Sequence, residues 1–366
     1  MKQSFEVVKL SDVCNSETSN LTLKNLENNF GEYSLYGASG FIKNIDFYKQ
    51  DKDYIGIVKD GAGIGRVMLL EKYSSILGTM QYIIPKENIN IKYLYYNLIK
   101  MNLSKYFTGS TIPHIYFKDY KKEKVFLRTL PEQEKISIIL DKVSKILEMK
   151  KQQFLGLDSL VKFQFLKIFG DPILNEKNWK KVFLSDCCVI NPKKNEIKLD
   201  DNFPLSFIGM ADVSEKGKIK TSNIKLYKEV KNGFTYFKEN DVLFAKITPC
   251  MENGKGGIAK NLYSKIGFGS TEFHVLRPIE NISNSHWLYY LTVLPFFRKN
   301  AERNMTGSAG QKRVPITYFQ KTLIALPPIE LQNKFADFVK QVDKSKVILG
   351  KALKFLSFRL NYFNML

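Results

Sequence analysis

The chain has 366 residues, more than the roughly 100–200 residues that one domain usually takes, so two folded domains are expected. Its 44% hydrophobic and 13% aromatic residues exclude general disorder. Lysine and arginine outnumber the acidic residues 56 to 36. The resulting net charge of +20 favours nucleic acid as a partner over a surface that is merely rich in lysine.

Membrane attachment, another use of positive charge, has no support in the sequence. No apolar run approaches the ~20 residues that a transmembrane helix needs, and the initial stretch MKQSFEVVKL lacks the apolar core of a signal peptide. A cytoplasmic protein is therefore expected.

Residues 1–128 are predicted to form a first mixed domain. The β-rich run at residues 53–60 precedes a glycine-rich turn at residues 61–65, and the apolar run that starts at Lys92 fits a short helix. The turn lacks both the G-x-G-x-x-G spacing and the G-K-[ST] sequence of nucleotide-binding loops. A tight turn after a strand is therefore favoured over a phosphate-binding loop.

Residues 129–170 are predicted to form one long helix. Pro131 suits the first helical turn, and Gly170 followed by Pro172 provides the stop. Apolar side chains recur every seven residues, at Leu140, Leu147, Phe154, Val161 and Ile168. This spacing predicts a coiled-coil seam.

Residues 171–325 repeat the first domain and are predicted to form a second one. The tripeptide Leu-Ser-Asp occurs at residues 10–12 and again at residues 184–186. The tripeptide Thr-Gly-Ser occurs at residues 108–110 and again at residues 306–308. Repeated segments in the same order indicate a duplicated unit rather than chance.

The second domain also carries a β-rich run, at residues 241–249. The turn sequence NGKGG follows at residues 253–257, and the apolar run from His286 fits a short helix like that of the first domain.

Residues 326–366 are predicted to form the second long helix, with apolar residues every seven positions at Phe335, Val342, Leu349, Leu356 and Phe363. A helix of about 38 residues spans roughly 57 Å, so a seam of that length needs an equally long partner. Antiparallel pairing of the two long helices is favoured over two unrelated amphipathic helices. The expected fold class is α/β (α+β): two mixed domains, each followed by a long helix of an antiparallel coiled coil.

No catalytic set is evident. Adjacent Cys187 and Cys188, with Cys14 and Cys250 elsewhere, do not give the C-x-x-C spacing of a zinc site, so buried reduced thiols are expected. Three scattered histidines allow no Ser–His or Cys–His arrangement, and the Asn/Asp-Pro-Pro-aromatic element of base methyltransferases is missing. The nuclease pattern PD-(D/E)xK is too loose to be excluded. No metal and no catalytic residue are expected in this chain.

The candidates for DNA contact are polar and basic residues in glycine-punctuated loops. Arginine and lysine can bind guanine, asparagine and glutamine can read adenine, and lysine more often binds phosphate. The candidates in the first domain are Lys59, Arg66, Ser110, Thr111, His114 and Lys118; those in the second are Lys246, Thr248, Asn253, Lys255, Ser308, Gln311, Lys312 and Arg313. For any single one of them, a solvated loop position is an equal alternative.

Essentially the whole chain resembles the specificity subunits of type I restriction–modification systems. The resemblance rests on the two repeats, the Thr-Gly-Ser segments, the helix entries LRTLPEQEK and LPPIELQ, the segment DVLFAKITPCMENGKGG and the long helices. The first domain departs from the pattern because it is shorter and carries DGAGIGR instead of the NGKGG turn. The two domains are therefore expected to read different sequences.

This resemblance implies a division of labour. Each domain would be a target-recognition domain that reads one half of a bipartite site in double-stranded DNA. The helices would set the spacing and dock two methyltransferase subunits, which restriction subunits can join. S-adenosylmethionine would bind to the methyltransferase subunits, and ATP and Mg to the restriction subunits, so this chain would be non-catalytic. Two alternatives stay open: an autonomous DNA-binding protein without a methyltransferase partner, and a fused nuclease or methyltransferase.

Overall fold

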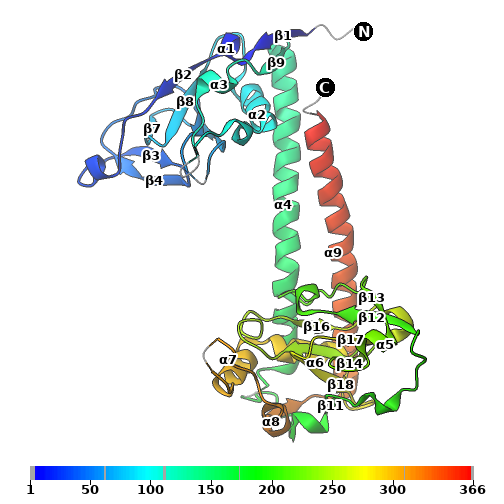
Figure 1. Cartoon of the computed structure of the whole chain (residues 1–366). Helices are drawn as coiled ribbons and strands as arrows, with labels where there is room; N and C mark the ends of the chain where they lie inside the picture. Colours follow the sequence, from blue (N-terminus) through cyan, green and yellow to red (C-terminus); the bar gives the residue numbers. More distant parts are fainter. Residues whose placement is uncertain (1–4, 62, 110–112, 173, 309, 364–366) are drawn as a thin grey trace. The chain divides into compact units, whose positions relative to one another are not determined.

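The computed structural model describes residues 5–61, 63–109, 113–172, 174–308 and 310–363, with the backbone alone described for Glu196 and residues 358–363. The chain divides into two compact units. The first unit comprises residues 1–152 and 351–366, and the second comprises residues 153–350. Each unit contains one mixed domain and part of both long helices (Figure 1).

The first unit is built on two sheets and a terminal strand pair. An antiparallel sheet has the order β2 (Cys14–Thr18), β8 (Met80–Pro85), β5 (Tyr54–Val58), β6 (Val67–Leu70). A smaller sheet has the order β4 (Gly40–Ile45), β3 (Tyr33–Gly37), β7 (Ser74–Ile76), and β1 (Glu6–Lys9) pairs with β9 (Lys124–Leu127). The short helices of its mixed domain are α1 (Leu10–Val13), α2 (Ile91–Met101) and α3 (Phe117–Tyr120), with 3-10 turns at Lys24–Leu26 and Leu103–Tyr106.

The second unit repeats this plan with one strand more. Its antiparallel sheet has the order β11 (Cys188–Ile190), β18 (Phe273–Pro278), β15 (Val242–Ala245), β16 (Gly256–Ile258). The other sheet has the order β13 (Ile224–Leu226), β12 (Pro204–Ile208), β17 (Ile266–Gly269), β14 (Thr235–Lys238), and β10 (Lys180–Phe183) pairs with β19 (Leu323–Leu326). Its short helices are α5 (Tyr227–Val230), α6 (Ser285–Val293), α7 (Pro295–Arg303) and α8 (Ile316–Lys321), with 3-10 turns at Leu184–Asp186, Lys194–Glu196, Met210–Asp212 and Tyr263–Lys265.

The Leu-Ser-Asp repeat makes the same corner in both domains. Leu10 and Leu184 are fully buried, and their backbone N–H groups donate to the carbonyls of Glu123 and Thr322 at 2.8 and 2.9 Å. The aspartate two residues later accepts from the backbone N–H at the residue before the leucine, which is the arrangement that caps a helical turn. The tripeptide therefore turns the first strand of each domain into its sheet.

The predicted long helices are α4 (Leu130–Phe169) and α9 (Ile329–Phe363). Within the second unit, the C-terminal part of α4 packs against the N-terminal part of α9. The rings of Phe165 and Phe169 lie 5.4 Å from the ring of Phe335, and Nζ of Lys346 lies 2.5 Å from a carboxylate oxygen of Asp158. Higher numbers on α4 thus meet lower numbers on α9, so the two helices are antiparallel here. A coiled coil along their whole length stays a prediction.

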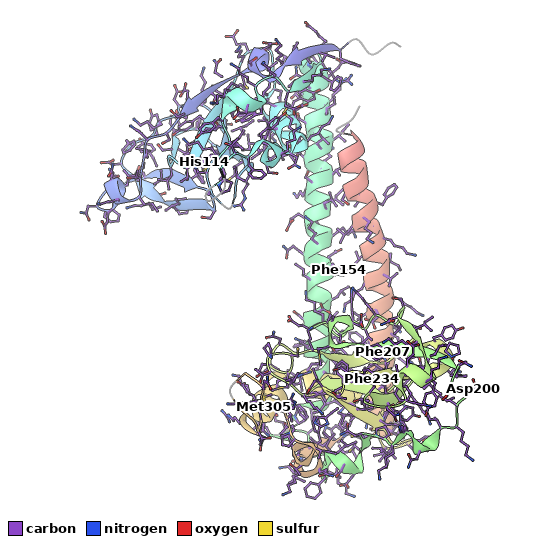
Figure 2. The ribbon with its side chains drawn as sticks, viewed as in Figure 1. His114, Phe154, Asp200, Phe207, Phe234 and Met305 are labelled. Atoms are coloured by element: carbon purple, nitrogen blue, oxygen red, sulfur yellow. The ribbon has the colours of Figure 1, made fainter. Side chains whose placement is uncertain are left out.

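The seam between these helices differs from the predicted heptad rows. Val161 and Val342 are buried as expected, but Phe154, labelled in Figure 2, and Ile168 are only half-buried. Phe165 and Phe169, which lie outside the predicted rows, are the fully buried contacts. These two positions face the aromatic core of the second domain as well as α9, and this explains why a two-helix heptad misses them.

Candidate nucleic-acid interface

The two loop segments predicted to contact DNA in the first domain are joined by backbone hydrogen bonds. We call the described residues of 59–66 and 108–118 loop pair 1. The N–H of Gly61 donates to the carbonyl of Pro113 at 3.1 Å, and the N–H of Ile115 donates to the carbonyl of Lys59 at 2.9 Å. Thr108 and His114 exchange two further bonds of 2.8 Å. Segments far apart in sequence therefore form one surface feature.

The second domain builds the same feature, loop pair 2, from the described residues of 246–255 and 306–313. The N–H of Thr248 donates to Lys312 at 3.0 Å, the N–H of Val314 donates to Lys246 at 2.9 Å, and Thr306 and Arg313 exchange bonds of 2.9 and 2.8 Å. Each bond has its counterpart in loop pair 1. The repeat seen in the sequence is thus a repeat of hydrogen-bonded geometry, and it aligns His114 with Arg313 and Lys59 with Lys246.

An acidic side chain holds the equivalent basic residue in each loop pair. Nδ1 of His114 lies 2.6 Å from Oδ1 of Asp60, and the guanidinium of Arg313 donates to both carboxylate oxygens of Glu272 at 2.8 and 2.9 Å (Figure 2 labels His114). The hydrogen bonds from Arg313 lower the pKa of Glu272 and raise that of Arg313. Sequence reasoning missed both acids. The signal available for Asp60 was its position inside an otherwise basic, glycine-rich segment.

Four candidates in loop pair 1 differ in how firmly they are held. Arg66 is exposed, and its guanidinium donates to the carbonyl of Ala38 at 2.5 Å. The ring of His114 stacks on Tyr116, and Nζ of Lys118 lies 5.1 Å from the centre of the same tyrosine ring. Lys59 is half-buried. The remaining candidates, Ser110 and Thr111, lie outside the described residues.

Three candidates in loop pair 2 are engaged by neighbouring groups. Burial lowers the pKa of Lys246, and nearby Arg313 lowers it further while Glu272 opposes both effects. Oγ1 of Thr248 donates to Glu252 at 2.7 Å and lies 3.9 Å from Sδ of Met305, which Figure 2 labels. Nζ of Lys255 donates to the carbonyl of Met210 at 3.2 Å. These side chains shape the loop, and their contact with DNA stays a prediction.

The other candidates of loop pair 2 lie on its surface. This group comprises Asn253, Ser308, Gln311 and Lys312, all of them exposed. They share a small surface feature with Arg313, whose side chain is 42% exposed. Amide, hydroxyl and cationic groups gathered in this way suit both the edges of bases and phosphate.

The predicted NGKGG turn is partly wrong, because its two final glycines begin strand β16. A Cβ atom on Gly256 would lie 2.8 Å from the carbonyl oxygen of Leu243, and one on Gly257 would lie 2.7 Å from that of Gly217. Glycine is needed there for close approach of backbones rather than for a turn.

In the second unit, burial keeps one histidine and two cysteines in their uncharged forms. Burial lowers the pKa of His274 to about 4, so the ring is neutral at pH 7; its Nε2 donates to the carbonyl of Val314 at 2.8 Å and its Nδ1 accepts from Asn191. Burial likewise raises the pKa of Cys187 to about 12 and raises that of Cys188, so neither is a thiolate.

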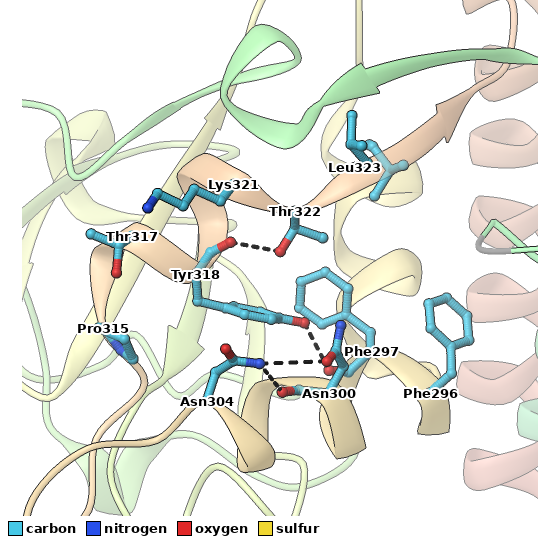
Figure 3. A pocket seen from close by; sticks show the side chains of 11 residues that line it. Phe296, Phe297, Asn300, Asn304, Pro315, Thr317, Tyr318, Lys321, Thr322 and Leu323 are labelled. Atoms are coloured by element: carbon cyan, nitrogen blue, oxygen red, sulfur yellow. Dashed lines mark hydrogen bonds between the residues drawn. The ribbon is translucent and has the colours of Figure 1, made fainter.

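A pocket of about 470 Å³ is lined by residues of α7, α8 and the start of β19 (Figure 3). Tyr318 donates its hydroxyl hydrogen to the carbonyl of Phe297 at 3.1 Å, and Asn304 donates to the carbonyl of Asn300 at 2.8 Å. The lining residues include amides, hydroxyls and the amine of Lys321 but no carboxylate, imidazole or thiol.

Among the residues that the structure describes, no three His, Cys, Asp or Glu side chains are grouped so that they could hold a metal ion. Within the same ranges, no helix is both long and apolar enough to cross a bilayer.

Comparison with known families gives one match that covers most of the chain. The family is described as "Type I restriction modification DNA specificity domain", and it matches residues 2–155 and 176–354. These two blocks correspond to the two halves of the duplicated geometry.

Curated relatives match in two ways. The specificity subunits of the type I restriction enzymes EcoAI and EcoEI from Escherichia coli are 42% identical over 157 residues and 40% identical over 153 residues. These matches cover 43% and 42% of this chain but only about a quarter of each relative, 26% and 25%. The MjaVIII specificity subunit from Methanocaldococcus jannaschii is 24% identical over 337 residues, with coverage of 84% of this chain and 76% of the relative.

Two solved structures share the fold. The S subunit of a type I restriction–modification system from M. genitalium has a TM-score of 0.59 at 15% identity, covering 99% of this chain and 96% of that one. A chain from a structure that addresses complex assembly and conformational transition of the type I R-M system has a TM-score of 0.59 at 16% identity, with coverage of 98% and 96%. The mixed α/β domains and long helices of this chain are therefore a fold already seen in such subunits.

Proposed function

We propose, from the premise that the chain belongs to the family of type I restriction–modification specificity subunits, that it selects the DNA sequence for a modification complex. The observation that carries this proposal is the duplicated loop pair. Two equivalent surface features, both with basic side chains and the second also with exposed amides, suit two separate stretches of DNA.

Each loop pair is proposed to read one half of a bipartite double-stranded site. In loop pair 2, the exposed amides and the hydroxyl of Ser308 are suited to base edges. Lysines such as Lys118 in loop pair 1 and Lys312 in loop pair 2 are suited to phosphates. The two pairs carry different side chains on the same backbone frame, so the two half-sites are expected to differ. The net charge of +20 supports the affinity for DNA backbone that both need.

The long helices are proposed to set the gap between the half-sites and to dock two methyltransferase subunits, to which restriction subunits can be added. Apolar side chains on the first part of α4 support a docking surface, since Ile138, Ile139, Ile146 and Met149 are each between 45% and 56% exposed. Apolar side chains gathered on a helix surface are typical of a protein partner.

Chemistry is proposed to reside in the partners. S-adenosylmethionine would bind to the methyltransferase subunits, and ATP and Mg to restriction subunits where these are present. This chain would contribute sequence selection in the cytoplasm and no reacting group.

Methylation mapping of host DNA with and without the gene tests the proposal. We expect one bipartite motif with a fixed gap to lose its methylation when the gene is removed. An unchanged methylation pattern, together with no methyltransferase recovered in a pull-down, would favour an autonomous DNA-binding protein. Methyl transfer or DNA cleavage by the purified chain alone would overturn the proposal in favour of a fused enzyme.

A further inference from the structure

A buried glutamine fastens the first domain to its long helix. Gln133 lies in the first turn of α4, and its side chain is fully buried. Its Oε1 accepts from the backbone N–H of Asn90 at 2.7 Å. Its Nε2 donates to the carbonyls of Arg128 at 2.8 Å and Asn88 at 3.1 Å. The amide group thus satisfies three backbone groups on two separate segments.

The second domain repeats this arrangement bond for bond. Gln332, in the first turn of α9, is also fully buried. Its Oε1 accepts from the N–H of Asn284 at 3.1 Å, and its Nε2 donates to the carbonyls of Pro327 and Ile282, both at 2.9 Å. We call these two arrangements the glutamine clamps.

Each clamp joins two parts of one domain: the short link that leads from the last strand into the long helix, and the N-terminus of a short helix. Arg128 and Pro327 lie in the short links from β9 to α4 and from β19 to α9. Asn90 and Asn284 are the N-caps of α2 and α6, where their side chains accept from backbone N–H groups of the first turn. A link that could otherwise pivot is therefore tied to a rigid element of its own domain.

The chemistry of the clamp requires an amide. A carboxylate would keep the bond from Asn90 or Asn284 but would oppose two carbonyl oxygens, and an apolar side chain would leave three backbone groups without partners. Leaving buried backbone groups unpaired costs more than the loss of an exposed hydrogen bond. An exposed glutamine further along the same helix, such as Gln152, has no comparable constraint.

We propose that Gln133 and Gln332 are positioning residues that fix the angle of each recognition domain on its long helix, and so define the length of the gap between the two half-sites. This inference rests on the proposed function. The clamps use residues separate from the two loop pairs, so a change in a clamp should alter the gap without altering which bases are read.

The other contacts between each domain and its long helix differ between the two units. We therefore expect substitutions in the two clamps to have effects of different size. In the first unit, α2 meets α4 through Asp141, which pairs with exposed Lys92 at 2.6 Å and accepts from Tyr96 at 2.8 Å. The apolar contribution there, at the position equivalent to Phe335, is the smaller, half-buried Ile136. In the second unit, the ring of Phe335 packs against Phe165, Phe169 and Tyr290. Because exposed polar contacts add little stability, the clamp of Gln133 should matter more.

The test uses the full chain with its methyltransferase partners and maps methylation motifs for Gln133→Met and Gln332→Met, which keep side-chain length. Gln152→Met and Gln341→Met, exposed positions on the same helices, are the matched controls. We expect unchanged half-site bases, but a rise of about tenfold in methylation at gaps one base pair longer or shorter, larger for Gln133→Met than for Gln332→Met. The controls should keep the single gap.

Several outcomes separate the possibilities. A folded variant that loses methylation equally at every gap, or that keeps the single gap, would overturn the inference, because the clamp would then serve stability alone. If Gln133→Met fails to fold, Gln332→Met and Gln133→Glu carry the test, since the former retains the aromatic packing and the latter one of the three bonds. A wild-type chain that directs no bipartite methylation would instead refute the proposed function.

Discussion

The two loop pairs share the same main-chain hydrogen bonds, but the acid that pairs with the equivalent basic residue lies at a different place in the sequence of each domain. In loop pair 1 the acid is Asp60, next to Lys59 in the same segment, and it meets an imidazole. In loop pair 2 the acid is Glu272, just before β18, and it meets a guanidinium. Main-chain hydrogen bonds fix the shape of each loop pair, so the side chains on it can differ between the two domains. One domain shape can thereby present two different surfaces to DNA.

A second contrast between the two domains concerns equivalent buried side chains on strands β8 and β18. Strand registers align Gln81 of β8 with His274 of β18, because their strand partners Ile57 and Phe244 occupy equivalent places in the sheets. Gln81 donates to the hydroxyl of Tyr120, whereas His274 donates to the carbonyl of Val314, directly after loop pair 2. The residue after loop pair 2 is therefore held by a side chain that gains a proton in acid, whereas Gln81 does not titrate.

The largest expected difference concerns the helix junctions. Phe335→Ala should destabilise the second unit by about 3–5 kcal/mol, because it empties a fully buried aromatic site. Ile136→Ala, at the equivalent and half-buried position of α4, should cost the first unit ~2 kcal/mol or less. Urea unfolding followed by tryptophan fluorescence reports the second unit, because both tryptophans, Trp179 and Trp287, lie there. Far-UV circular dichroism reports both units, and equal losses would contradict the contrast.

Acid should weaken the second unit selectively. The pKa values of His274 and His286 are lowered to about 4 by burial, whereas an unfolded histidine titrates near 6.5. The unfolded chain thus binds more protons between these values, so stability is full above about pH 6.5 and is lost as the pH falls toward 4. Each histidine should remove ~2 kcal/mol at pH 5 relative to pH 7.

The matched variant for this prediction is His274→Gln, which copies the first domain. It should reduce the loss of stability between pH 7 and pH 5 by about half, as measured by urea unfolding with tryptophan fluorescence. A wild-type second unit with the same stability at both pH values would contradict the buried neutral state of these rings.

The ion pair of loop pair 2 is expected to affect specificity more than affinity. Glu272→Gln replaces the carboxylate that pairs with Arg313 by a neutral amide. The guanidinium is then held less firmly, so it can adopt more rotamers and reach phosphates. We expect the ratio of affinities for target and non-target DNA to fall by about tenfold, measured by competition binding with the assembled complex. Asp60→Asn is the counterpart in loop pair 1. An unchanged ratio for Glu272→Gln would mean that Arg313 serves only to hold the loop.

The smallest expected effect is that of Lys312. Its equivalent in loop pair 1 is Pro113, so this charge belongs to loop pair 2 alone. Lys312→Ala should weaken binding to all DNA sequences about threefold and reduce the slope of log affinity against log salt by about 0.9, as loss of one phosphate contact predicts. A loss confined to one sequence would instead identify Lys312 as a base contact.

Much of the architecture could be predicted from the sequence because it is repeated. The Leu-Ser-Asp corners, the Thr-Gly-Ser segments and the long helices each occur twice in the sequence. The structure gives both corners equivalent hydrogen bonds, and Thr108 and Thr306 form the same paired bonds with His114 and Arg313. The predicted domain boundaries stay a prediction. The two compact units divide within α4 and α9, because each long helix packs with more than one part of the chain.

The features that could not be predicted from the sequence have physical reasons. Glu272 meets Arg313 across 41 residues, and no local pattern marks such a pair. Phe165 and Phe169 belong to the core of a domain as well as to a helix seam, so a seven-residue period alone does not select them. Gly256 and Gly257 lie in a strand because two backbones approach closely, a need that resembles a turn when only the sequence is seen.

In both domains the first strand pairs with the last, β1 with β9 and β10 with β19, so that Glu6 faces Leu127 and Lys180 faces Leu326. The chain therefore enters and leaves each domain at neighbouring points. Recombination could exchange everything between those points for a segment of another length and still rejoin the same helix at the same place. Each domain is in this sense a cassette, and new target sequences could arise by exchange of whole segments rather than by gradual substitution.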